Sequence, residues 1–166
     1  MRNGKRLGLT LVLLPLVANI GLAACGGNSS TVEPEIEEEL ILAAMEATIQ
    51  DEYRAELIYQ GVLDDFGEVR PFVNIINAEV RHSESIARLY ATRGIPVPES
   101  QWTASQIPRF PSLSTACQAG VEAEIENAEI YDKYFDLPLP DDVKFVFENN
   151  RRASINNHLP AFQRCS

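Results

Sequence analysis

The sequence predicts an all-α fold, a bundle of four helices with one long crossover between the second and third helices. Four segments repeat apolar residues at spacings of three and four, the period of a helix with one buried face. No segment shows the alternation typical of a half-buried strand. A stretch of 21 residues with four prolines separates the second periodic segment from the third. These three observations favour two helical hairpins joined by a long connection.

Residues 1–24 are predicted to be a lipoprotein signal peptide that lies outside the fold. A basic start precedes the apolar run LGLTLVLLPLVANIGL, and LAAC follows at residues 22–25. This order is typical of a secretory signal. A Cys directly after LAA resembles the bacterial lipobox, which implies cleavage before Cys25 and a lipid on its thiol; an ordinary signal peptide with a chance Cys is the alternative. Residues 25–32, which include glycines and serines, are predicted to be a flexible tether, and residues 33–166 the bundle.

The first predicted helix covers about residues 34–66 and the second about residues 71–92. Pro34 suits a first helical turn, and glutamates crowd the same end. The inward positions of the first helix alternate steps of four and three: Ile41, Met45, Thr48, Glu52, Ala55, Tyr59, Val62 and Phe66. Those of the second helix are Phe72, Ile75, Ile76, Glu79, His82, Ile86, Leu89 and Tyr90.

The third predicted helix covers about residues 115–135 and the fourth about residues 141–163. The inward face of the third consists of Val121, Glu124, Ala128, Tyr131 and Phe135, although three other glutamates in this helix compete with Glu124. The inward face of the fourth consists of Phe147, Arg151, Ser154, His158, Ala161 and Cys165. Pro160 lies inside this last segment and is expected to bend or end the helix.

Residues 94–114 form the connection between the second and third helices. A helix of about 20 residues is ~30 Å long, and an extended chain of this length spans up to roughly 70 Å. The connection can therefore cross the whole bundle, so we expect the second and third helices to run parallel.

Five polar side chains fall on the predicted inward faces: Glu52, Glu79, His82, Glu124 and His158. Counted from the two hairpin turns, they lie within a turn or two of the same height. A lone Glu is usually solvated and a lone buried His is usually a hydrogen-bonded core residue, but a charged carboxylate on an apolar face costs free energy unless it is paired. A divalent cation bound among the five would explain why these polar side chains lie on apolar helix faces. Mixed oxygen and nitrogen ligands suit Fe or Mn and tolerate Zn.

The motifs around these residues resemble those of ferritin-like proteins. EYRAELIY (residues 52–59) is similar to their first helix and EVRH (residues 79–82) to their second. More closely, FVNIINAEVRHSESIARLYATRGIPVP and NHLPAF resemble the bacterial ferritin-like family called domain of unknown function 2202. The resemblance covers most of residues 40–165 and implies a four-helix bundle with a two-metal carboxylate centre.

The sequence departs from this pattern on the fourth helix. Many ferritin-like di-iron proteins carry a second E-x-x-H motif there, whereas this chain has Ile155 three residues before His158. Five candidate ligands remain instead of six, which weakens the expectation of a second ion. A positive charge at Arg151, on the same predicted face, would oppose that ion further.

Cys117 and Cys165 are predicted to form a disulfide. Cys117 begins the third predicted helix and Cys165 follows the fourth, so antiparallel packing brings both to the same end of the bundle. An exported location is oxidising enough for the bond to persist. Two buried free thiols are the alternative.

The formal net charge of −10 argues against binding to nucleic acid, which needs a basic footprint. Cleavage after residue 24 would remove three basic side chains and no acidic one, leaving 11 basic and 24 acidic side chains. The lipid, rather than charge, would then hold the protein to a bacterial membrane, at the cell surface or the periplasmic face. We expect an exported metal-binding lipoprotein that oxidises Fe(II) with oxygen or peroxide. A non-catalytic metal binder and a metal-free interaction module are the alternatives.

Overall fold

The structure, a computed structural model, describes residues 34–166, and over that range the chain is helical and contains no strand, as predicted. None of the helices in this range has the length and apolar character needed to cross a membrane. The predicted signal peptide, the tether and Cys25 lie outside the described residues. The helices and their bounds are α1 Pro34–Phe66, α2 Phe72–Thr92, η1 Ala104–Gln106, α3 Leu113–Asp132, α4 Asp141–Ala153, η2 Ser154–His158 and α5 Leu159–Gln163.

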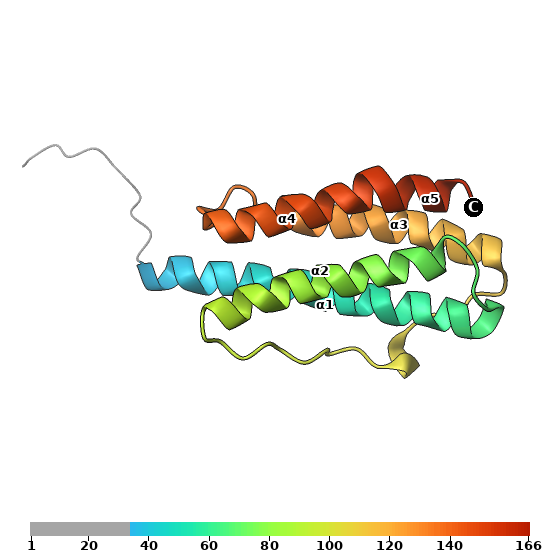
Figure 1. Cartoon of the computed structure of the whole chain (residues 1–166), viewed down its shortest axis with the longest axis horizontal. Coiled ribbons are helices and arrows are strands. Elements are labelled where there is room, and N and C mark those ends of the chain that lie inside the picture. Colours follow the sequence, from blue (N-terminus) through green and yellow to red (C-terminus); the bar gives the residue numbers. More distant parts are fainter. Residues whose placement is uncertain (1–33) are drawn as a thin grey trace, which may run out of the picture. The chain divides into compact units, whose positions relative to one another are not determined.

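The helices form two hairpins joined by the long crossover (Figure 1). α1 packs against α2 and α3, while α4 packs against α2 and α3 in turn. Residues 93–112 run back along the first hairpin, so α2 and α3 point in the same direction. This is the path that the length of the connection predicts.

Gln50, a buried residue of α1, binds the crossover through both its side chain and its backbone. Its Nε2 donates to the carbonyl of Glu99 at 2.8 Å, and its Oε1 accepts from the backbone N–H of Gln101 at 2.9 Å. The indole N–H of Trp102 donates to the carbonyl of Gln50 at 2.9 Å. These bonds hold the crossover beside the middle of α1, where Glu52 lies.

Apolar side chains form two separate core clusters, one toward each end of the bundle. The first includes Met45, Ile49, Ile86, Tyr131 and Phe147. The second includes Tyr59, Val62, Phe72, Ile75 and Phe162. The predicted polar residues occupy the level between the two clusters, because each lies between members of both along its own helix.

The fourth helical segment continues past Pro160 instead of ending there. η2 is a π-helical turn, in which the N–H of Leu159 donates to the carbonyl of Ser154, five residues back. Pro160 has no N–H, and in a regular α-helix its ring would clash with the carbonyl four residues earlier. The wider π turn precedes this proline, and His158 and Phe162 both stay on the buried face.

The predicted inward position of Arg151 is wrong. Asn150 is buried instead, and Arg151 lies toward the surface, where its Nε and Nη2 donate to the Asp132 carboxylate at 2.5 and 2.8 Å. A buried guanidinium without a partner would cost free energy, whereas Asp132 offers one at the surface. Arg151 therefore adds no positive charge to the buried centre.

Cys117 and Cys165 lie at disulfide distance, with Cα atoms 5.7 Å apart. Their bond joins the start of α3 to the residues that follow α5. The two cysteines thus reach the same end of the bundle, as predicted from the antiparallel packing of the second hairpin.

Candidate metal centre

The structure brings all five predicted side chains together between the hairpins. α1 supplies Glu52, α2 supplies Glu79 and His82, α3 supplies Glu124, and the π turn supplies His158. All five are buried. They form two groups that could each hold a metal ion, because the ligand atoms within each group lie within 4.8 Å of one another. Glu79 belongs to both groups.

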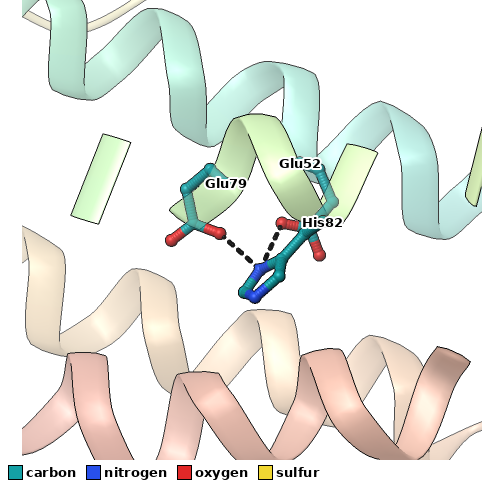
Figure 2. Close-up of side chains that lie close together, drawn as sticks. All are labelled: Glu52, Glu79 and His82. Atoms are coloured by element: carbon teal, nitrogen blue, oxygen red, sulfur yellow. Dashed lines mark hydrogen bonds and ion pairs between the residues drawn. The ribbon is translucent and has the colours of Figure 1, made fainter. Parts of the chain in front are cut away.

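The first group consists of Glu52, Glu79 and His82 (Figure 2). Glu79 and His82 are separated by three residues, so they project from the same face of α2. The Nδ1 atom of His82 lies 2.8 Å from Oε2 of Glu79 and 3.4 Å from Oε2 of Glu52. The imidazole therefore points between two carboxylates that come from different helices.

The second group, Glu79, Glu124 and His158, repeats this geometry. The Nδ1 atom of His158 lies 3.0 Å from Oε1 of Glu79 and 3.3 Å from Oε2 of Glu124. The rings of His82 and His158 stack with their centroids 5.4 Å apart. Each oxygen of Glu79 thus faces a different histidine.

Two tyrosines hold the outer glutamates in a crossed arrangement. The hydroxyl of Tyr131 on α3 donates to Oε1 of Glu52 on α1 at 2.5 Å, and the hydroxyl of Tyr59 on α1 donates to Oε1 of Glu124 on α3 at 2.7 Å. Each glutamate keeps its other oxygen toward a histidine. The same spacing is visible in the sequence, since each tyrosine lies seven residues after the glutamate of its own helix.

The surroundings of the two groups differ because of two asparagines that the helical periodicity did not single out, Asn127 and Asn150. Beside Glu52, Asn127 Nδ2 donates to Oε1 of Glu52 at 3.2 Å, and Asn150 Nδ2 donates to the hydroxyl of Tyr131 at 3.1 Å. Ser154 supports Asn127 with a hydrogen bond of 2.7 Å to its Oδ1. The first group is therefore set in a polar network.

The second group lies against aromatic rings instead. Tyr59 packs on Phe72 and Phe162, with ring centroids 5.6 and 5.3 Å away. Tyr59 contacts Glu124 through its hydroxyl, while its ring is part of the second apolar cluster. The carboxylate of Glu124 has one partner on each oxygen, Tyr59 and His158, whereas both donors to Glu52 bind the same oxygen, Oε1.

The buried charges shift one another's pKa values. Burial raises the pKa of Glu52 to about 8. Burial alone would also raise the pKa of Glu79, but His158 and His82, whose Nδ1 atoms lie 3.0 and 2.8 Å from its two oxygens, outweigh burial and lower the pKa to about 2. Burial alone would lower the pKa of both histidines, yet the carboxylates around them raise it to about 10 for His82 and about 9 for His158. Near pH 7 and without a metal, Glu79 is thus an anion between two protonated imidazoles, those of His82 and His158.

Within residues 34–166, two buried side-chain oxygens lack a hydrogen-bond donor, Oε2 of Glu52 and Oε1 of Glu79. Oε1 of Glu79 lies near Nδ1 of His158, but the pair is not aligned as a hydrogen bond. An unsatisfied buried acceptor costs about 1–3 kcal/mol, and more when it is charged. A divalent cation in each group would satisfy these oxygens, so the residues present fit a metal ion. Because the two groups share Glu79, five ligands can serve two ions without a glutamate at position 155.

Comparisons of the chain with protein-family models, with curated proteins and with solved structures found no match. The ferritin-like resemblance therefore rests on the sequence motifs themselves. The chemistry of the centre follows from its own side chains: two carboxylates and one imidazole in each group, with one carboxylate in common.

Proposed function

We propose that this chain is an exported, lipid-anchored, ferritin-like protein whose buried centre binds two iron ions and oxidises Fe(II) with oxygen or peroxide. The proposal rests on two buried groups, each made of two glutamates and one histidine, that share Glu79. The export and the anchor at Cys25 rest on the signal and lipobox pattern of residues 1–25.

The ligand set favours iron among the candidate metals. Carboxylate oxygens are hard ligands that suit Mn and Fe, and imidazole nitrogens suit Fe and Zn, so iron is the metal that both accept. Three carboxylates around two sites also stabilise the higher charge of Fe(III) relative to Fe(II). Two Fe(II) ions would supply the two electrons that, with two protons, reduce one O2 to hydrogen peroxide or one hydrogen peroxide to two water molecules.

The side chains have distinct parts in this scheme. Glu79 would contribute a ligand to both sites, while Glu52 and Glu124 would each contribute to one, held in place by the tyrosine that donates to it. His82 and His158 must give up their protons before they can bind metal, so loading the centre releases protons. The hydroxyls of the crossed tyrosines keep the outer carboxylates oriented throughout.

The acidic surface and the lipid fit a role at a membrane. The net negative charge draws cations toward the protein. A lipid on Cys25 ties each molecule to a membrane, which disfavours assembly into a closed iron-storage shell.

The test measures iron stoichiometry and then oxidation. A Cys25→Ser protein without its signal peptide is loaded with Fe(II) without oxygen, and its iron content is determined before oxygen or peroxide is added. We expect two ions per chain and an absorption change typical of Fe(III). Glu79→Gln should lose both ions, because each group loses a ligand, whereas Glu122→Gln on the exposed face of α3 should keep both. Full iron content in Glu79→Gln would refute the site.

A non-catalytic metal binder is the second candidate, and the burial of every ligand favours it. Structural metal sites are closed, whereas catalytic sites keep an open position. The same experiment separates the two functions: two ions per chain without an absorption change after oxygen or peroxide would indicate metal binding without turnover.

A further inference from the structure

A narrow cavity between α1 and α3 reaches one side of the metal centre. Its volume is about 10 Å³, which is room for about one water molecule. Glu79 and Glu124 line it, whereas Glu52 and His82 do not. Both carboxylates of the second group therefore face this cavity, whereas His158 does not line it. Glu79 also carries a buried oxygen that lacks a hydrogen-bond donor.

Arg54 on α1 is the most exposed of the charged side chains that line the cavity, which places it toward the mouth. Its side chain is 37% exposed, and its Nη1 lies 3.8 Å from Oδ1 of Asp51 and 3.8 Å from Oε2 of Glu126 on α3. Its guanidinium carbon lies 5.6 Å from the centroid of the Trp102 ring in the crossover. The guanidinium thus connects three segments around the mouth of the cavity.

Asp51 also lines the cavity and lies deeper than Arg54, with a side chain that is 14% exposed. Its Oδ2 accepts a hydrogen bond of 2.9 Å from Nδ2 of Asn127, and the same amide nitrogen donates to Oε1 of Glu52 at 3.2 Å. The other oxygen, Oδ1, lies 3.8 Å from Nη1 of Arg54, which is too far for a hydrogen bond. Asp51 therefore has one oxygen fixed toward the centre and one that is loosely paired.

We propose that Asp51 and Arg54 form an access gate for divalent cations, an inference that rests on the proposed metal function. Asp51 receives the cation at its loosely paired oxygen and passes it to Glu124 and Glu79. Arg54 repels the cation until its side chain moves away from the mouth. Exposed ion pairs are worth about 0–1 kcal/mol, so the contacts of Arg54 are easily broken.

The gate changes the rate of metal uptake and leaves the number of bound ions unchanged. Neither Asp51 nor Arg54 belongs to the two ligand groups. Charges at the mouth of a cleft change association rates by about tenfold to a thousandfold. Removing the guanidinium should therefore speed uptake, and removing the Asp51 charge should slow it.

The test follows uptake of Co(II) by the metal-free Cys25→Ser protein, using the visible absorption of bound Co(II). We expect Arg54→Met to load roughly tenfold faster and Asp51→Asn roughly tenfold slower, with final stoichiometry unchanged. Arg54→Lys keeps the charge and should load like the unmodified protein. Arg88→Met is the matched control, because Arg88 is an exposed arginine on α2 that pairs with Glu84.

The single tryptophan supplies a second readout. Trp102 lies beside Arg54, so its fluorescence should change on Co(II) addition before the absorption of bound Co(II) has fully developed. Uptake rates in Arg54→Met and Asp51→Asn that equal the control rate would overturn the gate while leaving the metal centre intact. A lower final stoichiometry in Asp51→Asn would also overturn it, since Asp51 would then be a ligand. Failure of the unmodified protein to bind Co(II) would instead refute the proposed function.

Discussion

At the scale of single residues, the shared carboxylate of Glu79 links the protonation of the two histidines. Its Oε2 lies 2.8 Å from His82 and its Oε1 lies 3.0 Å from His158. In the metal-free protein, the protons on His82 and His158 therefore balance the negative charge of Glu79. The pH dependence of stability should reveal this exchange.

The metal-free protein should lose stability as the pH rises from about 6.5 to 9. The pKa of each histidine is raised from 6.5 in the fold, so their contribution is complete below pH 6.5 and is lost as the pH passes through about 9 to 10. The raised pKa of Glu52, about 8 against 4.5, acts in the same direction, because the folded protein binds that proton more tightly. Urea unfolding in the presence of a chelator, at a series of pH values, measures the effect.

The metal-loaded protein provides the contrast. Metal binding requires deprotonated ligands, so the stabilisation by added metal should increase over the same pH range. The lowered pKa of Glu79 affects stability only below pH 4.5, where protonation removes its contribution. A metal-free protein whose stability is constant from pH 6.5 to 9 would contradict the charge arrangement.

Sequence spacing identified the five central side chains for a physical reason. A Glu or His within an otherwise apolar helical face is conspicuous, as Glu52, Glu79 and Glu124 show. Asn127 and Asn150 were missed because amides occur on either face of a helix. Their partners depend on the relative height of neighbouring helices, which one helix's periodicity does not specify.

At the scale of elements, the π turn is the feature that periodicity alone could not place. A fixed period of 3.6 residues predicts Ala161 on the buried face, whereas the structure buries Phe162. Pro160 signalled an irregularity, and the chain resolves it with a wider turn instead of a helix end. The error in the predicted face arises from this local change in hydrogen bonding and from the surface pairing of Arg151.

Gly120→Ala should destabilise the second hairpin and shift His158. A Cβ atom at position 120 would lie 2.6 Å from the Phe162 ring, so α3 and α5 must separate or the ring must move. Overpacking typically costs about 1–3 kcal/mol, which exceeds the gain of up to ~1 kcal/mol from helix propensity. Urea unfolding measures the loss, and metal titration should show weaker binding of one ion.

Gly61→Ala is the matched control for this substitution. Gly61 is also a buried glycine within a long helix, but its added Cβ would lie 3.3 Å from the flexible end of Arg109. We expect an unfolding free energy that is unchanged or higher by up to ~1 kcal/mol. Equal losses at positions 61 and 120 would show that packing against Phe162 is not the cause.

Reduction of the Cys117–Cys165 bond should lower the unfolding free energy. The bond joins residues 48 apart, and the chain-entropy estimate for a loop of that length is ~4 kcal/mol. Urea unfolding with and without reductant measures the difference, and a double Cys→Ser variant should not respond to reductant. Two reactive thiols at Cys117 and Cys165 in unfolded, unreduced protein would refute the bond.

At the scale of the whole molecule, the order of the helices and the direction of the crossover could be predicted from sequence. Residues 93–112 are long enough to cross the bundle, and short turns force the other neighbours to be antiparallel. The cavity at Asp51 and Arg54 could not be predicted, since it depends on the spacing between α1 and α3.

Cys25→Ser in the full-length chain should release the protein from the membrane fraction. The predicted lipid would be the main attachment, because an acidic protein gains no charge attraction to anionic lipid. Fractionation of cells expressing each form measures the distribution, with Ser30→Ala in the predicted tether as the control. A Cys25→Ser protein that stays with the membrane would contradict the lipobox interpretation.

The crossed pairs of Glu52 with Tyr131 and Glu124 with Tyr59 relate the two hairpins by an approximate twofold exchange. Each hairpin has a glutamate seven residues before a tyrosine on its first helix and a centre-facing histidine on its second. The exchange is incomplete at one position. Glu79 lies three residues before His82, whereas Ile155 lies three residues before His158. One carboxylate therefore faces the histidines of both hairpins, so a substitution of Glu79 affects both halves of the bundle, whereas a substitution of Glu52 or Glu124 affects one.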